Sequence, residues 1–212
     1  MYTRPGICLV VFGHVQRGLS DAHLLPVNYP FTQIDFTLYT FHMPLLFLLA
    51  GLYVWPALEK GRIPFIKSKF TAIVVPYFVW SIIQGGVQVA MSHSTNHPLA
   101  LSDWPKLFYA LLGQFWFLYA LMIWQLIAFA CGRRGPALMV VAIAALAFST
   151  ALPESILTTS MNMSIFFAAG TAIGPGRERY IASIATWKSF VVCCAGFGLA
   201  VHAIWNAAPV YS

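Results

Sequence analysis

The stretch FHMPLLFLLAGL, residues 41–52, decides the fold of this chain. It lies in an apolar run, residues 36–58, that contains no Asp, Glu, Lys or Arg. About 20 apolar residues in a helix span the hydrocarbon of a bilayer, so the run predicts a membrane helix. One histidine, His42, lies within it. Such a group at membrane depth is costly and usually faces a cavity or the protein interior. His42 is therefore a functional candidate, and a core histidine bonded to a neighbouring helix is the alternative.

The composition extends this interpretation to the whole chain. Hydrophobic residues make up 59% of the 212 residues, charged residues make up 8%, and the mean hydropathy is +0.75. A soluble domain of this size has too much surface to cover with so few charges. We therefore predict an all-α, polytopic helical bundle in contact with membrane lipid, formed by a single domain over residues 1–212. The net charge of +6 does not by itself indicate a nucleic-acid partner, and we predict none.

Seven apolar segments qualify as membrane spans. They cover residues 3–19, 36–58, 70–91, 107–130, 136–152, 156–174 and 188–206. If every span crosses, ten basic residues fall on one side of the membrane, and only Arg17 and Lys106 fall on the other. Cytoplasmic loops carry an excess of Lys and Arg, so we predict a cytoplasmic N-terminus.

This topology places two histidines at a similar depth. His14 is ten residues after Arg4, about 15 Å along a helix toward the outer face. His42 lies about six residues into the second span, roughly 9 Å below the outer surface. Arg17 is one turn beyond His14 on the same helix face. Gln114, in the fourth span, is expected at a similar depth. We expect these groups to line one outward-leaning cavity.

Four stretches resemble the acyltransferase 3 family of membrane O-acyltransferases, in the order and spacing of that family. Residues 4–15, with Arg4 and His14 near the two ends of an apolar run, are similar to its first helix. Residues 41–52 resemble its second helix, most closely in the fucose 4-O-acetylase-like branch. Residues 75–80 (VPYFVW) and 116–118 (WFL) are similar to parts of its third and fourth helices.

The chain also departs from the family pattern. The family usually has about ten membrane helices, so a chain with seven spans is predicted to be a truncated version that lacks the last helices. The arginine pair that often precedes the third helix is replaced by Lys67 and Lys69, and a serine common before the motif glycine is Ala50.

The resemblance implies transfer of an acyl group from acyl-CoA, with acetyl-CoA as the expected donor, to a sugar hydroxyl. A hydroxyl is a poor nucleophile until a base takes its proton as it attacks. The resemblance gives this catalytic role to His14. Arg4 is too far from His14 to orient it directly, so we expect Arg4 near the cytoplasmic donor, with an ordinary interfacial arginine as the alternative.

Several further residues are candidates for contacts with the two substrates. His42 is a second catalytic candidate, and it can instead bind the acceptor, orient His14 or tie two helices together. Arg17, Gln114 and Trp116 are candidates for acceptor binding, with helix bridging as the alternative for Gln114 and core packing for Trp116. The basic segment 59–69, interpreted as a loop, offers Lys67 and Lys69 to the phosphates of coenzyme A, although such loops also arise from topology and attract anionic lipid.

The spacing of the histidines, cysteines and acidic residues gives no metal site, and no tightly bound cofactor is expected. The leading function is a membrane O-acyltransferase, with acetyl as the expected group. Its substrates are acyl-CoA and a carbohydrate acceptor of the cell envelope, and the expected location is a bacterial inner membrane. The alternatives are a transporter with a histidine proton relay and a catalytically inactive family member.

Overall fold

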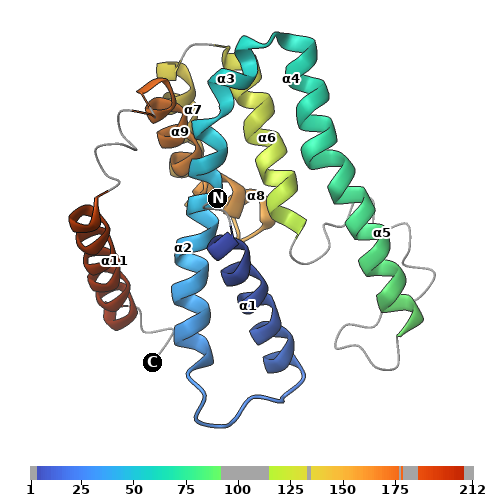
Figure 1. Ribbon diagram of the computed structural model, residues 1–212, viewed down its shortest axis with the longest axis vertical. Helices are drawn as coiled ribbons and strands as arrows, with labels where there is room; N and C mark the ends of the chain where they lie inside the picture. Colours follow the sequence, from blue (N-terminus) through green and yellow to red (C-terminus); the bar gives the residue numbers. More distant parts are fainter. Residues whose placement is uncertain (1–3, 92–114, 133–134, 177, 179–185, 208–212) are drawn as a thin grey trace. The chain divides into compact units, whose positions relative to one another are not determined.

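The computed structural model describes residues 4–91, 115–132, 135–176, 178 and 186–207, and every regular element in these ranges is a helix (Figure 1). The prediction of an all-α protein is confirmed. The elements are α1 (Arg4–Asp21), α2 (Phe31–Leu52), α3 (Val54–Glu59), α4 (Arg62–Lys69), the π-helix η1 (Phe70–Val74), α5 (Val75–Ala90), α6 (Trp116–Cys131), α7 (Gly135–Ser149), α8 (Ile156–Asn162), α9 (Ser164–Ile173), the short 3-10 turn η4 (Gly174–Gly176) and α11 (Trp187–Ala207).

Each of the seven predicted spans contains a helix. Three helical segments are long and apolar enough to cross a membrane: Phe31–Glu59, Arg62–Ala90 and Ile156–Gly176. Shorter apolar helices cover Trp116–Cys131, Gly135–Ser149 and Val191–Asn206. These segments indicate an integral membrane protein.

The segment 62–69 corrects the sequence interpretation, because it forms helix α4 rather than a loop. Between α3 and α4, the helical conformation is interrupted only at Lys60 and Gly61, and Gly61 adopts a φ of 103°. Pro64 lies in the first turn of α4, where its missing N–H costs no intrahelical hydrogen bond. From Arg62 the helix then continues through η1 and α5 to Ala90.

The described chain divides into two compact units, residues 1–45 with 176–212 and residues 46–175. The division falls within α2, directly after Pro44 and Leu45. Proline has no N–H to continue the helical hydrogen-bond ladder. The prediction of a single domain over residues 1–212 stays a prediction.

In the first unit, α1 and the first half of α2 face each other, and α11 packs on α2 through aromatic rings. The rings of Phe36 and Trp205 meet edge to face with centroids 5.7 Å apart. Those of Phe41 and Phe197 meet in the same way at 5.4 Å. Such pairs add to the packing energy beyond the area that they bury.

In the second unit, α2 and α9 approach so closely that only glycine fits between them. A Cβ atom on Gly170 would lie 3.0 Å from the Leu52 nitrogen, and one on Gly51 would lie 3.0 Å from the Thr171 nitrogen. The indole nitrogen of Trp55 donates a 2.7 Å hydrogen bond to the Thr171 carbonyl at the same crossing. Small residues of this kind let membrane helices bring their backbones together.

Candidate active site

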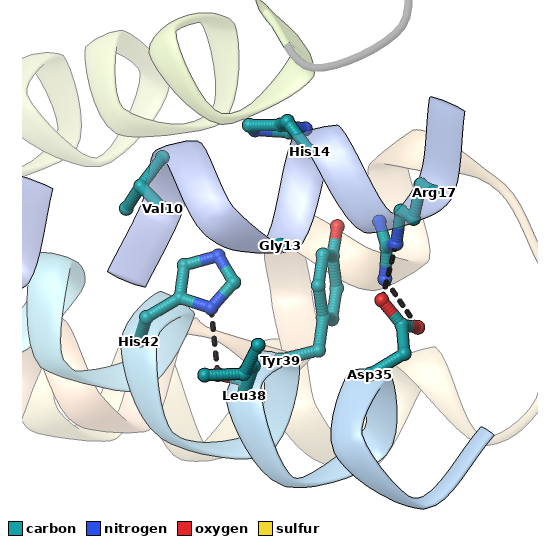
Figure 2. Close-up of a pocket in the computed structure, with 8 residues that line it drawn as sticks. All are labelled: Val10, Gly13, His14, Arg17, Asp35, Leu38, Tyr39 and His42. Atoms are coloured by element: carbon teal, nitrogen blue, oxygen red, sulfur yellow. Dashed lines mark hydrogen bonds and ion pairs between the residues drawn. The ribbon is translucent and has the colours of Figure 1, made fainter. Parts of the chain in front are cut away.

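A small pocket in the first unit lies between one face of α1 and one face of α2 (Figure 2). Each face supplies four residues at positions i, i+3, i+4 and i+7, the spacing that aligns side chains on one side of a helix. The lining residues are Val10, Gly13, His14 and Arg17 from α1, and Asp35, Leu38, Tyr39 and His42 from α2. The predicted meeting of His14, Arg17 and His42 around one cavity is therefore present.

An ion pair joins the two helices at one end of the pocket. Arg17 Nε lies 2.6 Å from Asp35 Oδ1, and Arg17 Nη2 lies 2.8 Å from Asp35 Oδ2. This paired geometry is the strong form of an arginine–carboxylate contact because two hydrogen bonds fix the planes of both groups. The guanidinium also lies over the ring of Tyr39, with its Cζ atom 4.2 Å from the ring centroid. Arg17 is thus held in place by two residues of α2.

His42 is buried, with 8% of its surface exposed. Its Nδ1 atom lies 2.6 Å from the carbonyl oxygen of Leu38, one turn earlier in the same helix. Its ring meets the Tyr39 ring edge to face, with centroids 5.2 Å apart and planes at 90°. The imidazole is therefore fixed by a hydrogen bond on one side and by an aromatic ring on another.

His14 lines the same pocket, but the surroundings of its ring differ from those of His42. It is half-buried, and no described residue makes a hydrogen bond to its ring. Two residues further on, buried Gln16 donates a hydrogen bond to the Tyr29 hydroxyl, which ties α1 to the segment that leads into α2. This contact supports the register in which the two helix faces meet.

The other predicted site residues lie elsewhere or outside the described ranges. Arg4 begins α1, and Lys67 and Lys69 lie in α4 of the second unit. Lys67 is exposed, whereas half-buried Lys69 places its ammonium 5.4 Å from the ring centroid of Phe65. Trp116 begins α6 in the second unit, and Gln114 lies outside the described residues. The donor and acceptor roles of these five residues stay predictions.

Sequence reasoning missed Asp35 and Tyr39 as pocket residues. Both lie on the His42 face of α2, seven and three residues before that histidine. An acidic residue in the same helix face as a membrane histidine is a signal that could have identified Asp35. Its pairing with Arg17 depends on the register between α1 and α2, which local spacing does not give.

The pocket is equipped for proton transfer. It brings together two imidazoles, a phenol ring, a guanidinium and a carboxylate, and no serine, threonine or cysteine is among its lining residues. Among the described residues, no group of three or more His, Cys, Asp or Glu side chains is placed to hold a metal ion.

Comparison with known proteins identifies the family of the chain. The model of the acyltransferase 3 family, described as an acyltransferase domain, matches residues 6–211. Neither the curated proteins nor the solved structures contain a significant match. The family match covers nearly the whole chain, and the chain therefore belongs to the acyltransferase 3 family.

Proposed function

We propose that this membrane acyltransferase moves an acyl group, expected to be acetyl, from acyl-CoA to a hydroxyl of a sugar or cell-envelope glycan. The observation that carries the proposal is the pocket in which His14 and His42 line the same space within a chain of this family. A hydroxyl acceptor needs a base at the moment of attack, and histidine is the side chain suited to this task near neutral pH.

The reaction has a simple proton balance. The acceptor oxygen attacks the thioester carbonyl, and its proton passes to a pocket histidine as the new C–O bond forms. The C–S bond then breaks, and the same proton passes to the departing thiolate to give free coenzyme A. The histidine returns to its neutral form, so no other acid or base is consumed.

The donor would be held through its phosphates. Helix α4 presents exposed Lys67 and half-buried Lys69, and cations of this kind bind phosphate. Arg4 is proposed to contribute from the start of α1. On the acceptor side, Arg17 lines the pocket, and Gln114 and Trp116 are proposed as further contacts.

We place the protein in a bacterial inner membrane with a cytoplasmic N-terminus. The support for this orientation is the distribution of charge, since ten basic residues would fall on the N-terminal side. The donor would then bind from the cytoplasm, and the pocket would lie in the outer half of the membrane.

A transfer assay tests the proposal. The protein in lipid nanodiscs is incubated with radiolabelled acetyl-CoA and a panel of glycans, and label in the glycan is counted. We expect transfer by the wild type and its loss in the double variant His14→Gln with His42→Gln. His202→Gln is the matched control, because His202 is exposed on α11 and does not line the pocket.

Two outcomes would contradict the proposal. Folded wild-type protein that labels no hydroxyl acceptor would favour an inactive family member. Proton flux across proteoliposomes that disappears in the double histidine variant would favour a transporter.

A further inference from the structure

The two ring nitrogens of His42 are not equivalent. Nδ1 lies 2.6 Å from the carbonyl oxygen of Leu38. A carbonyl oxygen only accepts hydrogen bonds, so Nδ1 must carry the proton that it shares. In the neutral imidazole, the other nitrogen, Nε2, then holds a lone pair and no proton. The backbone of α2 thus sets the tautomer of the side chain.

This lone pair is directed into the pocket. Figure 2 shows the second nitrogen of His42 on the edge of the ring that points toward α1. None of the described residues makes a hydrogen bond to Nε2. An incoming hydroxyl can therefore donate to this atom without displacing a contact within the described protein.

The orientation of the ring is fixed by a series of contacts on one side of the pocket. Asp35 holds Arg17 through two hydrogen bonds, and Arg17 lies over the Tyr39 ring at 4.2 Å. Tyr39 in turn meets the His42 ring at 90°. A base whose rotamer is held by its neighbours does not have to be reorganised when the reaction occurs.

His14 lacks these supports. It is half-buried, and no described residue makes a hydrogen bond that would select one of its tautomers. Of the two pocket histidines, His42 is the one whose proton-accepting atom is defined before substrate binds.

We infer that Nε2 of His42 is the atom that accepts the proton of the acceptor hydroxyl. The inference rests on the proposed acyl transfer, and it assigns the base to a different residue from the one that the family resemblance implies. As the hydroxyl oxygen bonds to the acyl carbon, its proton moves to Nε2, and the Leu38 carbonyl stabilises the resulting imidazolium through Nδ1–H. The proton then leaves Nε2 for the departing thiolate.

The tautomer can be measured without any assay of activity. The protein is produced with ¹⁵N-labelled histidine, and the imidazole signals are recorded by NMR in nanodiscs. The His42 signals are assigned by their loss in His42→Gln, while His202→Gln removes a different set. We expect a protonated Nδ1 and an unprotonated Nε2 in neutral His42, the opposite of the form that free histidine prefers. A proton on Nε2 instead would overturn the assignment.

Kinetics provides the second arm of the test. His42→Gln should lower kcat by about 10²–10⁴-fold, the usual contribution of a positioned base, and change the KM for the acceptor far less. His202→Gln should keep wild-type turnover. A folded His42→Gln protein that keeps near wild-type kcat would remove His42 from proton transfer. A wild type without activity would count against acyl transfer itself, and the NMR result would still decide the tautomer.

Discussion

The strength of the contact between Arg17 and Asp35 depends on how deeply the two side chains are buried. Their side chains are 35% and 23% exposed, so the pair lies between a surface salt bridge and a fully buried one. Surface pairs contribute little, whereas breaking a buried pair leaves a costly unpaired charge. At this depth we expect the value of the pair to come mainly from orientation, because the guanidinium keeps Tyr39 against His42.

A double-mutant cycle tests whether Arg17 and Asp35 act as one unit. Arg17→Lys keeps the charge but loses the planar fork, and Asp35→Asn removes the carboxylate charge. Each variant should lower kcat/KM, and the double variant should lose less than the two losses combined. We expect a coupling of about 1 kcal/mol, within the range for residues in direct contact. Effects that combine independently would mean that Arg17 and Asp35 act on the pocket separately.

Single residues could be predicted well where one side chain carries the signal. A histidine stands out in an apolar span, so His14 and His42 could both be predicted as residues that line a pocket. Arg17 could be added from its helical spacing to His14. Tyr39 could not be distinguished in this way, because tyrosine is common in membrane helices and its role depends on the two side chains beside it.

At the scale of helices, the crossing of α2 and α9 is where the packing of the second unit is least tolerant. A methyl group on Gly51 would overlap with the carbonyl oxygen of Phe167 and lie 3.1 Å from the Gly170 Cα atom. Both neighbours belong to the backbone, which cannot rotate away as a side chain can. The two helices would have to separate.

Gly51→Ala should therefore destabilise the protein. Overpacking of this kind costs about 1–3 kcal/mol, which corresponds to a decrease in Tm on the order of 5 °C for a chain of this size. Thermal unfolding in detergent, followed by size-exclusion chromatography, measures the change. Gly196→Ala is the control, because a Cβ there meets nothing within 4 Å. Equal Tm values for the two variants would show that the crossing yields more easily than the backbone contacts indicate.

Helix α4 shows why one element was misread. Four cations, a glycine and a proline within residues 60–69 are typical of a polar loop. The helix forms nevertheless, because the proline lies in its first turn and Phe65 is buried. The rings of Phe65 and Phe129 stack at 5.7 Å, which anchors α4 to α6. This tertiary contact is not visible in the local sequence.

If α4 binds the donor, Lys67→Ala combined with Lys69→Ala should raise the KM for acetyl-CoA with little change in kcat. Added salt should raise the wild-type KM in the same direction, because exposed charges are screened. The control is Lys188→Ala, which removes an exposed cation from α11. A donor KM that stays constant in the double variant would leave the cations of α4 as a topology signal only.

At the scale of the whole molecule, the all-helical fold and the approximate positions of the described helices followed from hydrophobicity alone, because each apolar run must satisfy its backbone hydrogen bonds internally in lipid. The boundaries were less accurate. The helix that contains the second predicted span begins at Phe31, before the apolar run that starts at residue 36, and the polar residues Thr32, Gln33 and Asp35 lie in its first turns.

The proposed orientation predicts a pattern of labelling. In a variant without native cysteines, Asn28→Cys and Glu154→Cys should react with an impermeant thiol reagent in intact cells. Lys60→Cys and Glu178→Cys should react only after the cells are opened. All four positions are exposed. Labelling of Lys60→Cys from outside would reverse the orientation and move the pocket to the cytoplasmic half of the membrane.

The length of the continuous helix from Arg62 to Ala90 can be compared with the thickness of a bilayer. Its 29 residues correspond to about 43 Å at the ordinary helical rise, whereas the hydrocarbon of a bilayer is about 30 Å thick. If the helix stands perpendicular to the membrane, it is roughly two turns longer than the hydrocarbon is thick. This excess matches the length of α4, the end of the helix that carries the cations. The lysines of α4 would then lie outside the hydrocarbon layer. A large, highly charged donor could reach them there, while its acyl chain alone enters the membrane.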